Sequence, residues 1–329
     1  MKMILILTNK DDITVDFIIR ELVNQNIQYY RLNTEDIPND IDINFNVDKG
    51  KFLLHDKNKN IDINLQDIEA VYFRRAEINK FNYVTNISEQ ERNYLRSEMA
   101  FVLEGIYKVL RNKFWLNNIY NIRDAENKIY QLQLAQEVGF EIPASTISNQ
   151  FFSVNQFVNK CNRDCIIKPI KTGNMKDITN PKVIFTSKLD STMQDNIDRV
   201  EAFPLFIQKN IHKRYDLRCI VVDDEVFVAE IDSQNDRDSL IDWRRAKSYL
   251  EHREHLLPLQ IKSMCIQMTK KLKLNYSAID LILDENGNYI FLECNPNGQW
   301  AWLEKRLNFP ISKKIVRILM EKRCKDENI

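Results

Sequence analysis

The sequence predicts an α/β fold of two or three lobes, and three observations support it. Residues 3–33 give an apolar strand, an amphipathic helix and a second strand, which is the pattern of a βαβ unit. Residues 277–298 are two apolar runs joined by Asn286-Gly287, the dipeptide most typical of a tight β-hairpin. The chain has 329 residues, whereas one domain commonly holds about 100–150 residues, so we expect several cores.

We expect three lobes along the chain. The first lobe, 1–115, ends in a long helix that Ser88 and Glu91 open at the spacing of a capping box. The second lobe is 116–200 and the third is 201–329. The first βα turn contains no glycine, so the first lobe lacks the fingerprint of a dinucleotide-binding domain.

The charge balance and the apolar runs exclude several classes of protein. The 47 basic residues balance 47 acidic ones without a long block of one sign, which argues against nucleic acid as the main partner. No apolar run is long enough to predict a membrane span, and the short apolar start lacks a signal-peptide cleavage site. The 6 cysteines form no CxxC pair, which indicates reduced thiols in a cytoplasmic protein.

Two lysines occupy unusual positions in the central lobe. Lys128 lies in the first turn of a helix predicted over residues 125–137. This end of a helix disfavours a cation, so Lys128 is either solvated or held by an anion. Lys168 ends an apolar strand beside the small turn 171–174. That position suits a phosphate contact, although a lysine that reaches out to solvent would give the same pattern.

The register of the C-terminal hairpin follows from its turn. If Asn286-Gly287 is a two-residue turn, Leu283 faces Ile290. Counting outward from the same turn, Asp280 faces Glu293 in a strand pair whose other residues are mostly apolar. Like charges directly opposite each other destabilise a strand pair, and burial strengthens their repulsion.

A divalent cation would remove this repulsion. Strand alternation adds Asn295 to the face that carries Asp280 and Glu293. Two carboxylates and an amide oxygen, completed by water and phosphate oxygens, suit Mg²⁺. The alternative is that one carboxylate is protonated, or lies at the surface because the turn is longer than two residues. A metal site, several cations and the pair Asp216 and Arg218 in one region indicate phosphoryl transfer from a nucleotide.

The order of these residues resembles the ATP-grasp ligases. The shared elements are Lys128, Lys168, “IQKNI” (207–211), “DLR” (216–218), and Asp280 followed by “ECNPNGQW”. Within that group, the chain resembles the peptide maturases that build graspetides of the microviridin and plesiocin type. The stretches that carry this closer likeness are “YFRRAE”, “AENKIYQLQLAQEVGFEIPASTISN” and “NPNGQWAWLE”. The likeness extends over almost the full chain.

The resemblance implies an ATP-grasp fold, in which a pre-ATP-grasp α/β lobe precedes central and C-terminal lobes that hold ATP between them. It also implies ATP and Mg²⁺ as cofactors. The implied ATP contacts are Lys128, Lys168, Gln208, Lys209, Ile211 and Asp216. The implied metal ligands are Asp280, Glu293 and Asn295, and Arg218 would stabilise the transferring phosphoryl group.

Arginines in two segments are candidates for substrate recognition. In the charged stretch 233–249, Arg244 and Arg245 match the geometry of peptide carboxylates, or else form a solvated basic face. Arg74 and Arg75 end a predicted strand of the first lobe. They either support the site or contribute to a dimer contact.

The predicted function is ATP-dependent macrocyclisation of a ribosomal precursor peptide with a leader and a core rich in acidic and hydroxyl residues. The resemblance implies that an Asp or Glu side chain becomes an acyl phosphate, which a Ser/Thr hydroxyl or a Lys amine attacks to give an ester or an amide. A homodimer is expected by analogy with the family. The alternatives are a ligase that adds a free amino acid to a carboxylate and a nucleotide-binding module without turnover. Lys213 is predicted to be exposed, and Trp300 is given only a packing role.

Overall fold

The computed structural model forms two compact units and describes residues 3–171, 174–175, 182–190 and 201–322. The first unit contains residues 3–122, 274–276 and 299–322; the second contains residues 123–273 and 277–298. Residues 172–173 of the turn predicted beside Lys168 lie outside the described part. The predicted lobes are continuous segments, whereas each of these units is built from separate segments of the chain. The division into three lobes stays a prediction.

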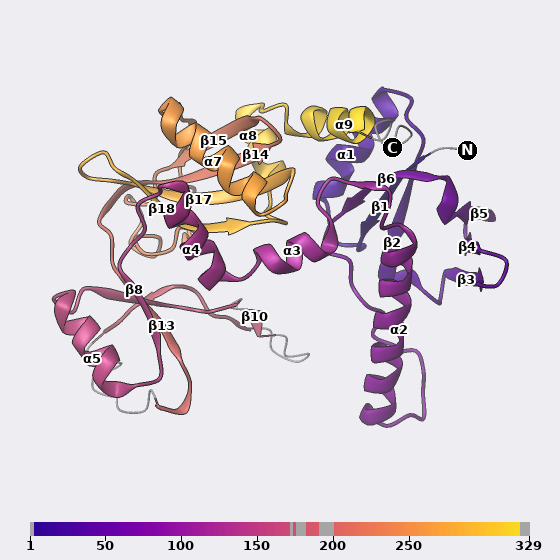
Figure 1. Cartoon of the computed structure of the whole chain (residues 1–329), viewed down its shortest axis with the longest axis horizontal. Helices are drawn as coiled ribbons and strands as arrows, with labels where there is room; N and C mark the ends of the chain where they lie inside the picture. Colours follow the sequence, from indigo (N-terminus) through magenta and orange to yellow (C-terminus); the bar gives the residue numbers. More distant parts are fainter. Residues whose placement is uncertain (1–2, 172–173, 176–181, 191–200, 323–329) are drawn as a thin grey trace. The chain divides into compact units, whose positions relative to one another are not determined.

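A parallel sheet organises the first unit (Figure 1). Its strands lie in the order β2 (Tyr29–Asn33), β1 (Met3–Thr8), β6 (Ile68–Phe73) and β7 (Phe114–Trp115). Helix α1 (Thr14–Asn24) connects β1 to β2, so the predicted βαβ unit is confirmed. Residues 4–7 of β1 are completely buried, as expected for a central strand of a parallel sheet.

The first unit also contains an antiparallel insertion and several helices. The insertion is a three-stranded sheet of β3 (Ile41–Asn46), β4 (Lys51–Asp56) and β5 (Ile61–Asn64). The helices are α2 (Glu89–Val109), α3 (Ile119–Ala125, shared with the second unit), α8 (Ala301–Leu307) and α9 (Ile311–Lys322), and α9 packs against α1. The predicted capping box opens α2, since Ser88 N–H donates to Glu91 at 2.6 Å and Glu91 N–H donates to Ser88 Oγ at 3.2 Å.

The second unit contains a four-stranded antiparallel sheet. Its strands lie in the order β12 (Ser187–Lys188), β9 (Cys165–Lys168), β13 (Leu205–Lys209) and β8 (Ser145–Ser148). Helix α5 (Phe151–Lys160) packs on this sheet through Val154 and Val158, which share a core with Cys165 and Ile207. A short separate pair is formed by β10 (Asn174–Met175) and β11 (Lys182–Val183).

The second unit also contains a five-stranded sheet (Figure 1). Its strands lie in the order β16 (His252–Glu254), β15 (Glu225–Ile231), β14 (Lys213–Val222), β17 (Tyr276–Asp284) and β18 (Tyr289–Asn295). Helices α4 (Lys128–Val138) and α7 (Leu259–Lys271) pack against it and against each other. Across the described residues, no helix has the length and apolar character needed to cross a membrane.

Helix α4 begins later than predicted. We expected a helix from residue 125, but Ala125 ends α3, and α4 starts at Lys128. Asn127 sets this start because its side chain accepts hydrogen bonds from the N–H groups of Ile129 and Tyr130. The predicted stop at Gly139 is confirmed, with φ of 100° in the left-handed region that glycine tolerates.

The hairpin of β17 and β18 differs from the predicted register near its turn. Asp284 N–H donates to the Asn288 carbonyl, so the loop has three residues, and Gly287 has φ of 88°. Leu283 therefore faces Tyr289, and the prediction that it faces Ile290 is wrong. A bulge between Asp280 and Leu281 shifts the register back, so that Asp280 pairs with Glu293 as predicted.

Candidate active site

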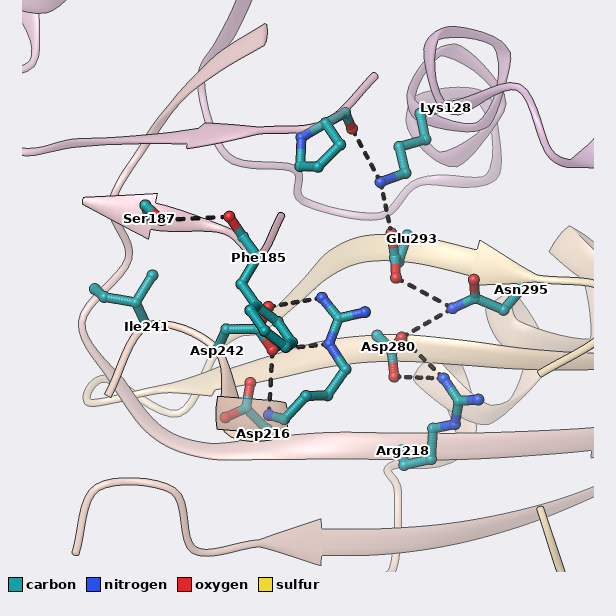
Figure 2. A network of polar contacts seen from close by, with 12 residues as sticks. Lys128, Phe185, Ser187, Asp216, Arg218, Ile241, Asp242, Asp280, Glu293 and Asn295 are labelled. Atoms are coloured by element: carbon teal, nitrogen blue, oxygen red, sulfur yellow. Dashed lines mark hydrogen bonds and ion pairs between the residues drawn. The ribbon is translucent and has the colours of Figure 1, made fainter. Parts of the chain in front are cut away.

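Asp280 and Glu293, here called the carboxylate pair, face each other in the β17–β18 hairpin (Figure 2). Asn295 joins them, because its Nδ2 donates to Asp280 Oδ2 at 3.0 Å and to Glu293 Oε1 at 3.2 Å. Only 16% of the Asp280 side chain and 20% of the Glu293 side chain are exposed. The predicted juxtaposition is confirmed, and its repulsion acts in a largely buried setting.

Lys128 lies beside the carboxylate pair in the first turn of α4 (Figure 2). Its Nζ is 3.2 Å from Glu293 Oε2 and donates to the Pro169 carbonyl at 3.2 Å. An anion therefore holds Lys128 at the helix end that disfavours a cation. The alternative of a merely solvated lysine is wrong.

Lys168, the last residue of β9, interacts electrostatically with Glu293 and Lys128. The pKa of Lys168 is lowered to about 8, chiefly by burial; Glu293 raises this pKa, and Lys128 contributes to lowering it. A lysine that reached solvent would keep a pKa near its ordinary value. Lys168 itself is half-buried, and its contact with phosphate stays a prediction.

Arg218 on β14 neutralises the other carboxylate. Its Nη1 donates to both oxygens of Asp280 at 2.9 Å, and 8% of its side chain is exposed. Burial raises the pKa of Asp280 in spite of Arg218. Burial also favours neutral Glu293, but Lys128 and Lys168 outweigh it and lower the pKa of that carboxyl. The negative charge of the pair therefore resides first on Glu293.

Arg244 in the short helix η4 (Trp243–Arg245) is held by Asp242. Its Nε donates to Asp242 Oδ1 at 2.8 Å, and its Nη2 donates to Oδ2 at 2.6 Å. Asp242 is only 5% exposed, whereas 53% of the Arg244 side chain is exposed. The charge of Arg244 acts on the carboxylate pair and lowers the pKa of Glu293. Sequence reasoning missed Asp242, because nothing in its spacing distinguishes it from other loop carboxylates.

Gly298 lets the chain pass closely over the ion pair of Arg218 and Asp280. A Cβ atom at Gly298 would lie 2.5 Å from Arg218 Nη2 and 2.3 Å from the Cβ of Ala278. Real Cβ atoms do not approach other atoms so closely. Sequence reasoning missed this requirement, because only the folded chain brings Gly298 over β14 and β17.

The predicted adenine hinge lies at the end of β13. Gln208 is fully buried, and its Nε2 donates to Ser145 Oγ at 2.9 Å. Its Oε1 has no hydrogen-bond partner among the residues that the structure describes. The Lys209 N–H donates to the Ala144 carbonyl at 2.8 Å, and Ile211 follows the strand half-buried. The hinge thus contains a buried acceptor, Gln208 Oε1, that accepts no hydrogen bond from the described part of the chain.

The structure brings Asp216 to Lys213 instead of to the carboxylate pair. Lys213 Nζ is 2.7 Å from Asp216 Oδ2, and Ser233 Oγ donates to the same oxygen at 2.6 Å. Lys213 is 7% exposed and Asp216 is 5% exposed. The prediction that Lys213 is exposed is wrong, because a buried carboxylate needs a cation beside it.

Arg74, Arg75 and Trp300 belong to the first unit. Arg74 is 1% exposed, and its Nε lies 2.8 Å from Asp12 Oδ2, so a buried ion pair accounts for it. Arg75 is exposed and has φ of 52°. Trp300 is fully buried and packs edge-on against Phe17, with ring centroids 6.0 Å apart. The packing role predicted for Trp300 is confirmed.

The carboxylate pair and Asn295 fit a hard divalent cation. Carboxylate and amide oxygens are the ligands that Mg²⁺ prefers, and rotation of the Asn295 amide would present its Oδ1. The polar N–H group of Asn295 already lies between oxygens from opposite strands. Within residues 3–171, 174–175, 182–190 and 201–322, no group of three His, Cys, Asp or Glu could hold a metal. Oxygen atoms from a ligand or from water would therefore complete the coordination.

Comparison with protein families agrees with this geometry. Residues 3–123 match the MvdD pre-ATP grasp domain, and residues 125–319 match the RimK-like ATP-grasp domain. The second match covers more than half of the chain, so the protein belongs to the RimK-like ATP-grasp family. The predictions of an ATP-grasp fold and of an ATP-dependent ligase are confirmed.

Solved structures of peptide-modifying ATP-grasp enzymes are similar over nearly the whole chain. The macrocyclase MdnC from Microcystis aeruginosa MRC, bound with precursor peptide MdnA, is 26% identical; the match has a TM-score of 0.85 and covers 97% of this chain and 99% of that one. A RiPP-associated ATP-grasp ligase of Chryseobacterium gregarium, in complex with ADP and a leader and core peptide, is 26% identical. Its TM-score is 0.88, with coverage of 98% of this chain and 97% of that one. The predicted resemblance to peptide maturases is confirmed.

A relative with another name matches a shorter segment. This protein, described as a “Probable alpha-L-glutamate ligase” of Histophilus somni strain 2336, is 26% identical over 221 residues. The match covers 65% of this chain and 70% of the relative. This chain is therefore similar to a protein named for ligation as well as to one named as a macrocyclase.

Replacing Gly298 with alanine tests the close packing over Arg218. The new methyl group would displace Arg218 from Asp280, so we expect Gly298→Ala to lower the rate of ATP turnover roughly ten- to hundredfold. The rate of ADP release measures this effect. Gly105→Ala is the matched control, because a Cβ at Gly105 in α2 meets no atom within 4 Å. Wild-type turnover in Gly298→Ala would show that the contact is unimportant.

Proposed function

We propose that this enzyme uses ATP and Mg²⁺ to activate carboxylate side chains of a ribosomally made precursor peptide and to close them into rings. The observation that carries the proposal is the buried carboxylate pair, surrounded by Lys128 of helix α4 and by Lys168 and Arg218 of two different sheets. This charge arrangement suits a metal-bound polyphosphate, since metal and cations together neutralise it. The similarity to MdnC and to the C. gregarium ligase supports a peptide as the acceptor.

The metal would be held by Asp280, Glu293 and Asn295. When bound, Mg²⁺ would neutralise the carboxylate pair and polarise phosphate oxygens. Lys128 Nζ is 3.2 Å from Glu293 Oε2, so it is placed at the edge of this site. Its role would be to orient phosphate oxygens beside the metal.

The nucleotide would lie between the two sheets of the second unit. Lys168 at the end of β9 would bind phosphate, and the buried Oε1 of Gln208 would accept a hydrogen bond from the adenine amino group. The backbones of Lys209 and Ile211 would complete the hinge. The predicted contact of Asp216 with the ribose or phosphates has less support, because Lys213 and Ser233 already bind its carboxylate.

Two arginines would act on the peptide and the transferring group. Arg218 would stabilise the γ-phosphoryl group while an Asp or Glu side chain of the peptide attacks it, which gives an acyl phosphate and ADP. A hydroxyl or amine of the same peptide then displaces inorganic phosphate and loses a proton. Arg244, fixed at its inner edge by Asp242 and half-exposed elsewhere, would bind the acidic side chain beforehand.

The remaining partners are proposed on narrower grounds. A leader segment of the precursor would bind apart from the core, as the peptide bound to the C. gregarium ligase has both parts. A homodimer stays a prediction from the family resemblance. The five cysteines in the described residues are buried free thiols, which supports the predicted cytoplasmic location.

Addition of a free amino acid to a carboxylate is the second candidate function. The H. somni relative named as a glutamate ligase favours it. The two reactions differ in stoichiometry, because ring closure removes one water per bond from the peptide, whereas ligation adds the mass of an amino acid residue.

Mass spectrometry of a precursor peptide tests the proposed function. A candidate precursor encoded beside the gene is incubated with the protein, ATP and Mg²⁺. We expect a loss of about 18 Da, one water, for each ring, and no change when Glu293→Gln replaces the wild type, because the metal ligand is lost. A gain in mass that depends on added glutamate would contradict macrocyclisation and support ligation. Base treatment then separates ester from amide bonds.

The affinity for ADP should decrease above pH 8. The lowered pKa of about 8 means that Lys168 loses its proton above this pH, so an anionic phosphate can bind only with uptake of a proton. We expect the ADP dissociation constant to rise by up to about tenfold per pH unit between pH 8 and 9.5. Calorimetric titrations in two buffers measure both the affinity and the proton uptake.

The matched variants for this test are Lys168→Arg and Lys188→Arg. Arginine stays charged over this pH range, so Lys168→Arg should flatten the pH dependence. The exposed Lys188, which pairs with Asp164 at 3.3 Å, is the control and should leave it unchanged. A wild-type affinity that is constant from pH 7 to 9.5 would contradict the role of Lys168.

A further inference from the structure

Gln131 on α4 binds the backbone of the residue between two proposed metal ligands. Its Oε1 accepts from the Cys294 N–H at 2.9 Å, and its Nε2 donates to the Cys294 carbonyl at 2.7 Å. The second hydrogen of Nε2 reaches the Ala125 carbonyl. Gln131 is 3% exposed, so its carboxamide is a buried group whose hydrogen-bonding capacity is filled by backbone.

This contact completes the edge of the five-stranded sheet. β18 is the last strand in the sheet order, and Cys294 pairs with Ile279 of β17. In an antiparallel pair, both backbone groups of a residue point either to the partner strand or away from it. The groups of Cys294 point away, and the carboxamide of Gln131 binds them as a neighbouring strand would. An edge strand would otherwise need water there.

Helix α4 brings both Lys128 and Gln131 to residues 293–294 of β18. Lys128 and Gln131 are three residues apart in α4, so they lie on one face of the helix. Lys128 contacts Glu293, and Gln131 holds Cys294 next to it. Strand alternation sends the side chains of Glu293 and Asn295 to the side opposite that of Cys294.

A second attachment fixes the other part of β18. The Phe291 N–H donates to the Glu141 carbonyl at 2.8 Å, and the rings of Phe140 and Phe291 have centroids 5.4 Å apart. The segment from α4 to Glu141 thus holds β18 at two positions. The Gln131 contact lies at the functional end, within one residue of Glu293 and of Asn295.

We propose that Gln131 is a positioning residue that fixes Glu293 and Asn295 relative to Lys128 and thereby sets the affinity of the site for Mg²⁺. The inference rests on the proposed function only in naming Mg²⁺ as the ion. A simple structural role would stabilise β18 without altering the dependence of nucleotide binding on the metal. The experiment therefore measures two properties: the stability of β18 and the Mg²⁺ dependence of nucleotide binding.

The test compares Gln131→Met with Gln136→Met. Methionine has a similar shape but cannot form either bond to Cys294. Gln136 is exposed on the same helix, so it controls for the substitution itself. Hydrogen–deuterium exchange of unliganded protein follows the amide of Cys294, and ADP titrations at several Mg²⁺ concentrations follow the metal. Gln131→Glu is a second variant, which keeps the acceptor for the Cys294 N–H and loses the donor to its carbonyl.

We expect Gln131→Met, which loses both bonds to Cys294, to speed exchange at Cys294 about tenfold or more. The Mg²⁺ concentration needed for half-maximal ADP affinity should rise about tenfold, which corresponds to about 1.4 kcal/mol. Gln136→Met should match the wild type. Gln131→Glu should exchange more slowly than Gln131→Met, because it retains one bond.

Two results would overturn the inference: wild-type exchange at Cys294 in Gln131→Met, or faster exchange with an unchanged Mg²⁺ requirement. If ADP binding by the wild type did not depend on Mg²⁺, the assigned effect on the metal would be wrong, even if the exchange result held. Absence of ring closure with normal Mg²⁺-dependent ADP binding would instead contradict only the proposed function.

Discussion

The repulsion between Asp280 and Glu293 is the constraint on which the rest of the second unit depends. Two carboxylates that face each other in a largely buried hairpin are unfavourable unless positive groups surround them. The protein supplies Arg218 from β14 to one carboxylate and Lys128 from α4 to the other. Each of these cations sits where its own surroundings would disfavour it alone, so the charges hold one another in place.

This mutual dependence explains why the site is assembled from several elements. Arg218 can reach Asp280 only because Gly298 leaves room for its guanidinium. Arg244 can keep an exposed donor near the pair only because the buried Asp242 fixes its other edge. An anionic ligand with its own cation can exchange with these partners at small electrostatic cost, because the site already holds charges of both signs. That property suits the metal-bound nucleotide of an ATP-grasp enzyme.

The sequence was sufficient to predict the central pair but not the path of the chain around it. The Asn-Gly dipeptide placed Asp280 opposite Glu293, although the loop has three residues; a bulge beside Asp280 shifts the register back by the one residue that the longer loop had changed. The correct pairing thus came from two departures that cancel. Bulges are set by tertiary packing, so the local sequence does not predict the bulge beside Asp280.

Other parts of the site were beyond sequence reasoning for similar physical reasons. The approach of Gly298 to Arg218 and the hydrogen bond from Ser233 to Asp216 depend on segments that meet only in the fold. The capping box of α2 could be predicted from the sequence, because Ser88 and Glu91 interact within one helical turn. The Asn127 cap also acts locally, but the apolar pattern alone places the start of α4 at residue 125, three residues too early.

A crystal structure with ADP and Mn²⁺ tests the central claim most directly, because anomalous scattering locates the metal without assumptions about its ligands. We predict a manganese peak bound by oxygen atoms of Asp280, Glu293 and Asn295, with Lys128 turned from Glu293 to the phosphates. A metal bound elsewhere, with the Lys128–Glu293 and Arg218–Asp280 pairs both unchanged, would contradict the account.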